Sequence, residues 1–366
     1  MKQFMNKCLG AFILSLLVQV GCSKELQPIG PVVEKPVTSK QSITDMVLIY
    51  EGGAHRKEVW NTTLFEPYVV TKDQQNNYHW MFDAFLFLEI KDGNGRGFAS
   101  YYEKLPARKQ EWQTLINRYF QPGNAICALN DCIEQFKSKV GKAPAKRQVV
   151  VFIPEPIPNQ KDWGDINGEA MDFSKQTHRI NAIKWFIRTV QEKFKSANLQ
   201  NLELHGFYWV AEEATNSRDL TNEVSQYLRQ NNYSFNWIPY FTADGWKQWK
   251  SLGFHKAWLQ PNYFFKDYIT FGRLDSAFQR ATANGMSLEL EFDDNALKKY
   301  GKGYKLENYL NVFQERGVLD SMSVAYYQGG SSLYKLWTSP EAEDKALYRR
   351  LADIIVRRQE NGIRSK

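Results

Sequence analysis

The chain has 366 residues, of which 43% are hydrophobic and 24% charged, and its formal net charge is +7. This composition is ample for a sizeable core and is unlike that of a disordered chain. The positive excess is modest and the basic residues form no dense tract with interleaved aromatics, so we expect no nucleic-acid partner.

Residues 1–21 have the pattern of a secretory signal peptide. An apolar run from Leu9 to Val20 follows a short basic segment, and it is shorter than the ~20 residues that a membrane-spanning helix needs. Gly21 and Cys22 come next, an order typical of lipoprotein signals, in which the cysteine is lipidated. We therefore expect a lipid anchor at Cys22 that holds the protein to a bacterial membrane in the cell envelope. Gln19, where an aliphatic residue is usual, leaves a plain secretory signal as the alternative.

Residues 22–45 contain three prolines and no sustained apolar period, so they are interpreted as the lipidated cysteine and a flexible tether. We expect one domain over residues 46–358 and a polar tail over 359–366. Two cysteines of this domain, Cys127 and Cys132, lie five residues apart. Because disulfides persist in exported proteins, we expect these two to be bonded, with two buried free thiols as the alternative.

Eight short apolar stretches alternate with segments of helical periodicity. The predicted strands cover 46–53, 82–90, 147–156, 202–213, 235–243, 255–265, 287–294 and 321–330, and the predicted helices cover 107–121, 175–196, 217–230, 271–283, 304–316 and 340–358. This alternation predicts an α/β protein with parallel strands, and eight units favour a single closed (β/α)8 TIM barrel over an open sheet. Residues 54–81 look least helical and are expected to form a long active-site loop.

Acidic residues dominate the positions where the predicted strands end. In a (β/α)8 barrel the active site forms at these carboxyl ends. The candidates are Glu51, Glu89, Glu155, Glu212, Glu213, Glu291, Asp293 and Asp294. The five histidines are scattered and the cysteines lack metal-ligand spacing, so we predict neither a metal site nor a cofactor. The glycine-rich segment 92–97 lacks the full nucleotide-binding fingerprint.

Two strands supply the most informative carboxylates. The seventh alternates strictly, so Glu289 and Glu291 point into the barrel while Leu288 and its apolar neighbours face the helices. The fourth ends in Glu212 and Glu213, of which only one can face the interior, and the phase of the strand favours Glu212. The structural alternative is that these carboxylates form ion pairs in the barrel or lie in ordinary loops.

Two carboxylates at facing strand ends are what glycoside hydrolysis requires, one protonated and one ionised. We therefore predict Glu212 and Glu291 as the catalytic pair, with Glu155, Glu289 and Glu213 in reserve.

Amide and aromatic side chains near the same strand ends are suited to a carbohydrate substrate. Amides and phenols can bond sugar hydroxyls, and aromatic rings can pack against a sugar ring. The predicted substrate-binding residues are Gln260, Asn262, Tyr263, Tyr326 and Trp163. An oligo- or polysaccharide is thus the expected partner, and the sequence gives no oligomeric state.

The segments GFYWVAEE, LQPNYFF and LELEFDD resemble those of an uncharacterised-domain family of bacterial lipoproteins and secreted proteins, over residues 46 to about 358. A glutamate after strand four and another after strand seven also resemble the retaining glycosidase clan of (β/α)8 barrels. That resemblance implies Glu212 as acid/base and Glu291 as nucleophile. Ala211 stands where many clan members have asparagine, so retention or inversion stays open. The alternative function is a non-catalytic, lipid-anchored glycan-binding protein, which would need no pair of inward carboxylates.

Overall fold

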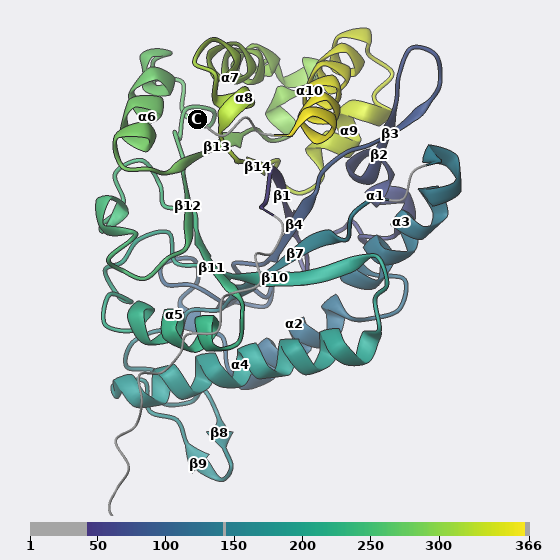
Figure 1. Cartoon of the computed structure of the whole chain (residues 1–366). Helices are drawn as coiled ribbons and strands as arrows, with labels where there is room; N and C mark the ends of the chain where they lie inside the picture. The colour runs from purple at the N-terminus through teal and green to yellow at the C-terminus, as the bar shows by residue number, and fades with distance from the viewer. Residues whose placement is uncertain (1–41, 142–143, 363–366) are drawn as a thin grey trace, which may run out of the picture. The chain divides into compact units, whose positions relative to one another are not determined.

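The computed structural model describes residues 42–141 and 144–362 (Figure 1). The predicted signal peptide, Cys22, the predicted tether up to residue 41 and the last four residues lie outside the described residues. The first barrel strand begins at Asp45, and the last helix that the structure describes ends at Asn361.

Eight parallel strands form a closed barrel, in the order β1-β14-β13-β12-β11-β10-β7-β4. The strands are β1 (Asp45–Tyr50), β4 (Ala84–Leu88), β7 (Arg147–Ile153), β10 (Leu202–Trp209), β11 (Ser234–Trp237), β12 (Lys256–Leu259), β13 (Ser287–Glu291) and β14 (Val324–Tyr327). Each falls within one of the eight predicted segments or overlaps it closely. The predicted (β/α)8 fold is therefore confirmed.

Helices surround the strands (Figure 1). They are α1 (Thr62–Val69), α2 (Lys109–Tyr119), α3 (Ala125–Val140), α4 (Gln176–Ala197), α5 (Thr221–Gln230), α6 (Gly272–Ala283), α7 (Gly303–Glu315), α8 (Val318–Ser321), α9 (Ser332–Thr338) and α10 (Ala342–Asn361). Short hairpins or ladders join β2 (Val70–Lys72) with β3 (Tyr78–Trp80), β5 (Arg96–Gly97) with β6 (Leu105–Pro106), and β8 (Asp165–Ile166) with β9 (Glu169–Ala170). Within the part of the chain that the structure describes, no helix is both long and apolar enough to cross a membrane.

The segment 54–81 is only partly a loop. Its first residues leave β1 as irregular chain, but α1 and the β2–β3 hairpin follow. Asn61 caps α1 because its side-chain oxygen accepts a hydrogen bond from the backbone N–H of Leu64 at 2.9 Å. The prediction of one long loop is therefore wrong for the second half of the segment.

The core explains why the strands appear as continuous apolar runs. Every residue of β4 and of β7 is buried, because one face of each strand meets the helices and the other fills the barrel. On α4 the buried residues Ile180, Ile183 and Ile187 recur at helical spacing and cover the outside of the sheet. Full burial of each such side chain contributes about 1.5–3 kcal/mol.

A polar cluster closes the amino ends of the strands. Asp83 accepts hydrogen bonds from the backbone N–H groups of Thr44 and Asp45, at 2.9 and 2.7 Å. Arg358 on α10 donates to Asp45 at 2.8 Å, and Tyr326 donates to the same carboxylate oxygen, also at 2.8 Å. These contacts join the last helix and the last strand to the first, so this end of the barrel serves stability.

A bulge in β10 sets the orientation of the residues that follow it. β7 advances by one residue, from Val149 to Val150, while the paired strand β10 advances by two, from Leu204 to Gly206. His205 is therefore the extra residue of a β-bulge. At Gly206 the strand lies very close to β11, because a Cβ added there would be 2.2 Å from the carbonyl oxygen of Ser234. Only glycine fits this approach. Beyond the bulge, Tyr208 points into the barrel.

The predicted disulfide is wrong, because Cys127 and Cys132 are both free thiols. Both lie on α3, where five residues advance about 7.5 Å along the axis and rotate the side chain by roughly 140°. A disulfide needs Cα atoms within about 4.4–6.8 Å and converging side chains. Cys132 is buried instead, and burial raises the pKa of its thiol to about 12.

Candidate active site

Three glutamates meet inside the carboxyl end of the barrel. Glu289 and Glu291 occupy alternate positions of β13 and point inward, and Glu212 follows β10. Burial raises the pKa of Glu289 well above its usual range, and the charges of Glu291 and Glu212 raise it further. Glu289 is 2% exposed, and its Oε1 accepts no hydrogen bond from the residues that the structure describes. Burial and the neighbouring negative charges therefore favour the protonated form of Glu289.

Glu291 accepts strong hydrogen bonds from both the main chain and a side chain. Its Oε2 accepts hydrogen bonds from the backbone N–H of Asn262 at 2.6 Å and from the hydroxyl of Tyr309 on α7 at 2.5 Å. Burial nevertheless raises the pKa of Glu291 to about 7, against the effect of these donors. Glu291 can therefore exist in either protonation state near neutral pH.

A chain of two amides connects Glu212 with Glu291. Gln260 donates from Nε2 to Glu212 at 2.8 Å and accepts at Oε1 from Nδ2 of Asn262 at 2.9 Å. The same Nδ2 lies 3.3 Å from Oε1 of Glu291. Asn262 has a left-handed backbone, with φ of 52°, which turns both its N–H and its side chain toward Glu291. The two amides thus fix the positions of both carboxylates.

Glu212 also lines a cavity of about 230 Å³ beyond the ends of β7, β10 and β11. The hydroxyl of Tyr102 donates to its Oε2 at 3.2 Å. Burial raises the pKa of Glu212, while the hydrogen bonds from Gln260 and Tyr102 lower it in part. Two further carboxylates, Glu155 and Glu213, line the same cavity. Glu212 therefore stands between the interior cluster and an open space that a ligand can enter.

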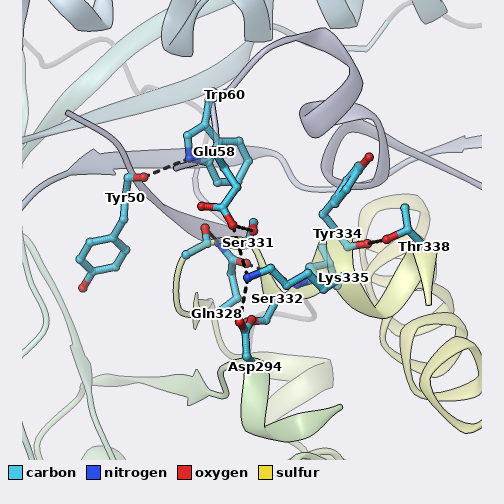
Figure 2. A network of polar contacts seen from close by, with 12 residues as sticks. Tyr50, Glu58, Trp60, Asp294, Gln328, Ser331, Ser332, Tyr334, Lys335 and Thr338 are labelled. Carbon is cyan, nitrogen blue, oxygen red and sulfur yellow. Dashed lines mark hydrogen bonds and ion pairs between the residues drawn. The ribbon is translucent and has the colours of Figure 1, made fainter. Parts of the chain in front are cut away.

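A second cavity of about 440 Å³ opens beyond the ends of β1, β13 and β14. Tyr50 and Tyr327 line it, with their rings edge to face at 5.7 Å, and the charges of Glu212 and Glu289 act on Tyr50. Next to this cavity, Lys335 on α9 forms ion pairs with Glu58 at 3.4 Å and with Asp294 at 2.7 Å (Figure 2). The loops after β1 and β13 are thereby tied together.

Two other strand-end glutamates form ion pairs with arginines. Arg56 makes a bidentate pair with Glu89, at 2.7 and 2.8 Å. Glu51 accepts hydrogen bonds from Arg118 and, at 3.2 Å, from Asn124. Both glutamates are 0% exposed, and these pairs tie loops and helices to the barrel.

Residues 45–353 match a protein family described as "Domain of unknown function (DUF4855)". The chain belongs to this family. A comparison with curated protein sequences gives no match.

Solved structures with a similar fold include enzymes of different kinds. A chitinase from Ipomoea carnea is 12% identical, with a TM-score of 0.42 over 84% of this chain and 99% of that one. A GH18 chitinase from Pseudoalteromonas aurantia is 9% identical, with a TM-score of 0.41 over 83% and 99%. A mutant tryptophan synthase α-subunit from Pyrococcus furiosus is also 9% identical, with a TM-score of 0.40 over 85% and 97%. These similarities concern the barrel fold.

In this DUF4855 domain, three aromatic residues predicted to bind substrate lie elsewhere. Trp163 is 1% exposed and packs against Trp112 at 5.2 Å between ring centroids, so it belongs to the core. Tyr326 is 1% exposed and points to Asp45 at the opposite end of the barrel. Tyr263 is 3% exposed, and its hydroxyl accepts a hydrogen bond from Asn308. In this structure none of the three side chains is exposed to a sugar.

Four tyrosines that we did not select lie at the site. Tyr102 donates to Glu212, Tyr240 donates to Glu213 at 2.6 Å, and Tyr309 donates to Glu291. Tyr327, rather than its neighbour Tyr326, faces the barrel interior because it pairs in register with Glu291. Strand alternation in 321–330 could have identified Tyr327. Tyr309 offers no such sign, because it occupies an ordinary apolar position of an amphipathic helix.

Proposed function

We propose that this chain is a cell-envelope glycoside hydrolase that uses Glu212 and Glu291. The observation that carries the proposal is the chain Glu212–Gln260–Asn262–Glu291, which holds two buried carboxyl groups at the ends of β10 and β13. Burial raises the pKa of both. Glycosidases need such a pair in opposite protonation states, and a shared environment of raised pKa values favours one proton between neighbouring carboxyls.

Glu212 is assigned as the general acid. It lines the cavity, so its proton can reach the oxygen of a glycosidic bond there. After the proton transfer the leaving group departs, and Glu212 remains as a carboxylate. Gln260 and Tyr102 each donate to one of its oxygens and stabilise that carboxylate after the transfer. Protonation of the leaving oxygen and breakage of its bond to the anomeric carbon then occur together.

Glu291 is assigned as the ionised partner. The donors Asn262 and Tyr309 stabilise its negative charge, which would otherwise be costly at 1% exposure. In a retaining reaction its carboxylate attacks the anomeric carbon, and in an inverting reaction it takes a proton from the attacking water. The anomer first released, observed by NMR, distinguishes the two.

The envelope location is a proposal that rests on the sequence alone. The apolar run, Gly21 and Cys22 support lipidation at Cys22. Metabolic labelling with a fatty-acid analogue should mark the unmutated protein and not a Cys22→Ser variant. Labelling of both proteins, or of neither, would contradict the anchor.

The test of the enzyme is hydrolysis of a diverse glycan panel by the purified protein. Glu212→Gln and Glu291→Gln should each lower the rate by orders of magnitude with the fold intact, as judged by circular dichroism and thermal melting. Glu223→Gln, on the surface of α5, is the matched control because it also removes one carboxylate, and it should keep full activity.

The outcomes of the glycan panel distinguish this catalytic pair from other residues and hydrolysis from binding alone. Cleavage that survives both substitutions would reject this pair and move the chemistry to Glu289 or Glu155. Binding without cleavage across the panel would favour the non-catalytic glycan-binding protein. A panel that includes uncharged, acetylated and amine-bearing glycans covers the substrate types that a cavity of hydroxyl and carboxyl groups can accept.

A further inference from the structure

The cavity beside Glu212 is unusually rich in carboxyl groups. Three line it, those of Glu155, Glu212 and Glu213, together with hydroxyl and amide groups. Among the described residues that line it there is no lysine, arginine or histidine. Arg179, whose charge acts on Glu155, donates its own hydrogen bonds to the main-chain carbonyls of Pro156 and Asn216. The carboxylates of the cavity therefore have no cation to bind among its walls.

Among these carboxyl groups, that of Glu155 gives the strongest indication of a ligand-binding site. It is 3% exposed, and its Oε2 accepts a hydrogen bond from the backbone N–H of Ser100 at 2.7 Å. The side chains of Ser100 and Asn216 also act as donors to this carboxyl group and lower its pKa in part, against burial, which raises it. Oε1 of Glu155 accepts no hydrogen bond from the described residues. A buried carboxylate oxygen without a donor is costly, and a positively charged donor in the cavity would remove that cost.

The aromatic wall of the cavity is also suited to a cation. Tyr101, Tyr102 and Tyr240 line it, and the face of a tyrosine ring attracts an ammonium group. Tyr101 has a φ of 73°, which is rare for a bulky residue, and it is 80% exposed. Backbone strain of this kind is often kept at sites that bind ligands. This backbone conformation places Tyr101 beside Asn216, and Nδ2 of Asn216 lies 3.4 Å from the hydroxyl of Tyr101.

We propose that this cavity is a subsite for an amino sugar with a free primary amine, whose ammonium donates to Glu155. The inference rests on the proposed function in that it names the substrate class of the same site. An N-acetylated sugar lacks the charge and keeps one N–H donor in place of the three of an ammonium, so it would give Oε1 of Glu155 no charged partner. The site should therefore distinguish a glycan with free amines from its acetylated counterpart.

The experiment compares pairs of oligosaccharides that differ only in N-acetylation. Oligomers of glucosamine and of N-acetylglucosamine form one pair, and those of galactosamine and N-acetylgalactosamine form another. Binding to the purified full-length protein is measured by calorimetry near neutral pH. At least one amine-bearing oligomer should bind about tenfold or more tightly than its acetylated partner, the order expected for one charge-assisted hydrogen bond.

Variants assign the preference to the cavity. Glu155→Gln should abolish most of it, whereas Glu223→Gln, with the same change of charge on the surface of α5, should preserve it. If Glu155→Gln fails to fold, Glu213→Gln offers a second carboxylate of the same cavity and should reduce the preference.

Three results would overturn the proposal. They are equal or tighter binding of the acetylated oligomers, absence of binding by every amine-bearing oligomer, and a preference that Glu155→Gln leaves unchanged. The readout is separate from hydrolysis. Preferential binding without cleavage would reject the hydrolase and keep the subsite, and cleavage of uncharged glycans without an amine preference would do the reverse.

Discussion

Replacing Glu291 by glutamine should weaken the dependence of stability on pH. The pKa of Glu291 is raised from 4.5 to about 7 in the folded protein, chiefly by burial. The folded state thus holds this proton more tightly than the unfolded state does. The stability that the protonated group contributes is complete below about pH 4.5 and is lost as the pH rises through about 7.

The magnitude follows from the shift. A change of one pKa unit corresponds to about 1.36 kcal/mol, so a shift from 4.5 to about 7 makes Glu291 responsible for a loss of about 3 kcal/mol between acidic and alkaline pH. The steepest slope that one proton can give is about 1.4 kcal/mol per pH unit. Glutamine cannot ionise. Its amide also lacks one acceptor for the donors around Glu291, which lowers stability by about 1 kcal/mol at every pH.

The assay is urea unfolding at several pH values from about 5 to about 8, within the range where the linkage acts. The free energy of unfolding of the unmutated protein should fall with rising pH, and that of Glu291→Gln should fall distinctly less. Glu223→Gln should keep the slope of the unmutated protein. A rise of stability with pH in the unmutated protein, or an equal slope in Glu291→Gln, would refute the raised pKa of Glu291 in the folded protein.

Three other predictions concern single residues. Asn262→Ala should lower stability by about 1–2 kcal/mol, because alanine disfavours the left-handed backbone, whereas Asn262→Gly should keep the backbone; equal melting temperatures for the two would contradict this. Trp163→Ala should cost about 3–5 kcal/mol of stability and leave glycan affinity unchanged, since Trp163 packs in the core; weakened binding in a folded variant would return Trp163 to the site. Cys127 and Cys132 should both be alkylated in the unfolded, unreduced protein, as read by mass spectrometry of their peptide; a disulfide-linked peptide would be the contrary result.

The fold could be predicted because its strands are short, apolar and regularly separated. A strand such as β7 is buried on both faces and therefore forms an unbroken apolar run. Helix α3 was not predicted, although its buried residues recur at helical spacing, and it follows α2 after a brief turn. The disulfide prediction failed because this helix was missed, since two cysteines on one helix face different directions at a spacing of five.

The candidate site could be predicted where strand alternation applied. Glu289 and Glu291 point inward as the period of two requires. Alternation stops where a strand ends, so it could not reveal that Tyr263 turns away after the left-handed Asn262. Nor could it reveal Tyr102, which reaches Glu212 from a loop on a distant part of the sequence.

The bulge in β10 sets the phase of the strand from Gly206 to Trp209, where β10 ends. Without the additional residue at His205, each of these residues would point to the opposite face of the sheet, because side chains alternate along a strand. Tyr208 would then leave the barrel interior and Trp209 would enter it. The composition of the barrel interior at the carboxyl end of β10 thus depends on one extra residue in the middle of the strand.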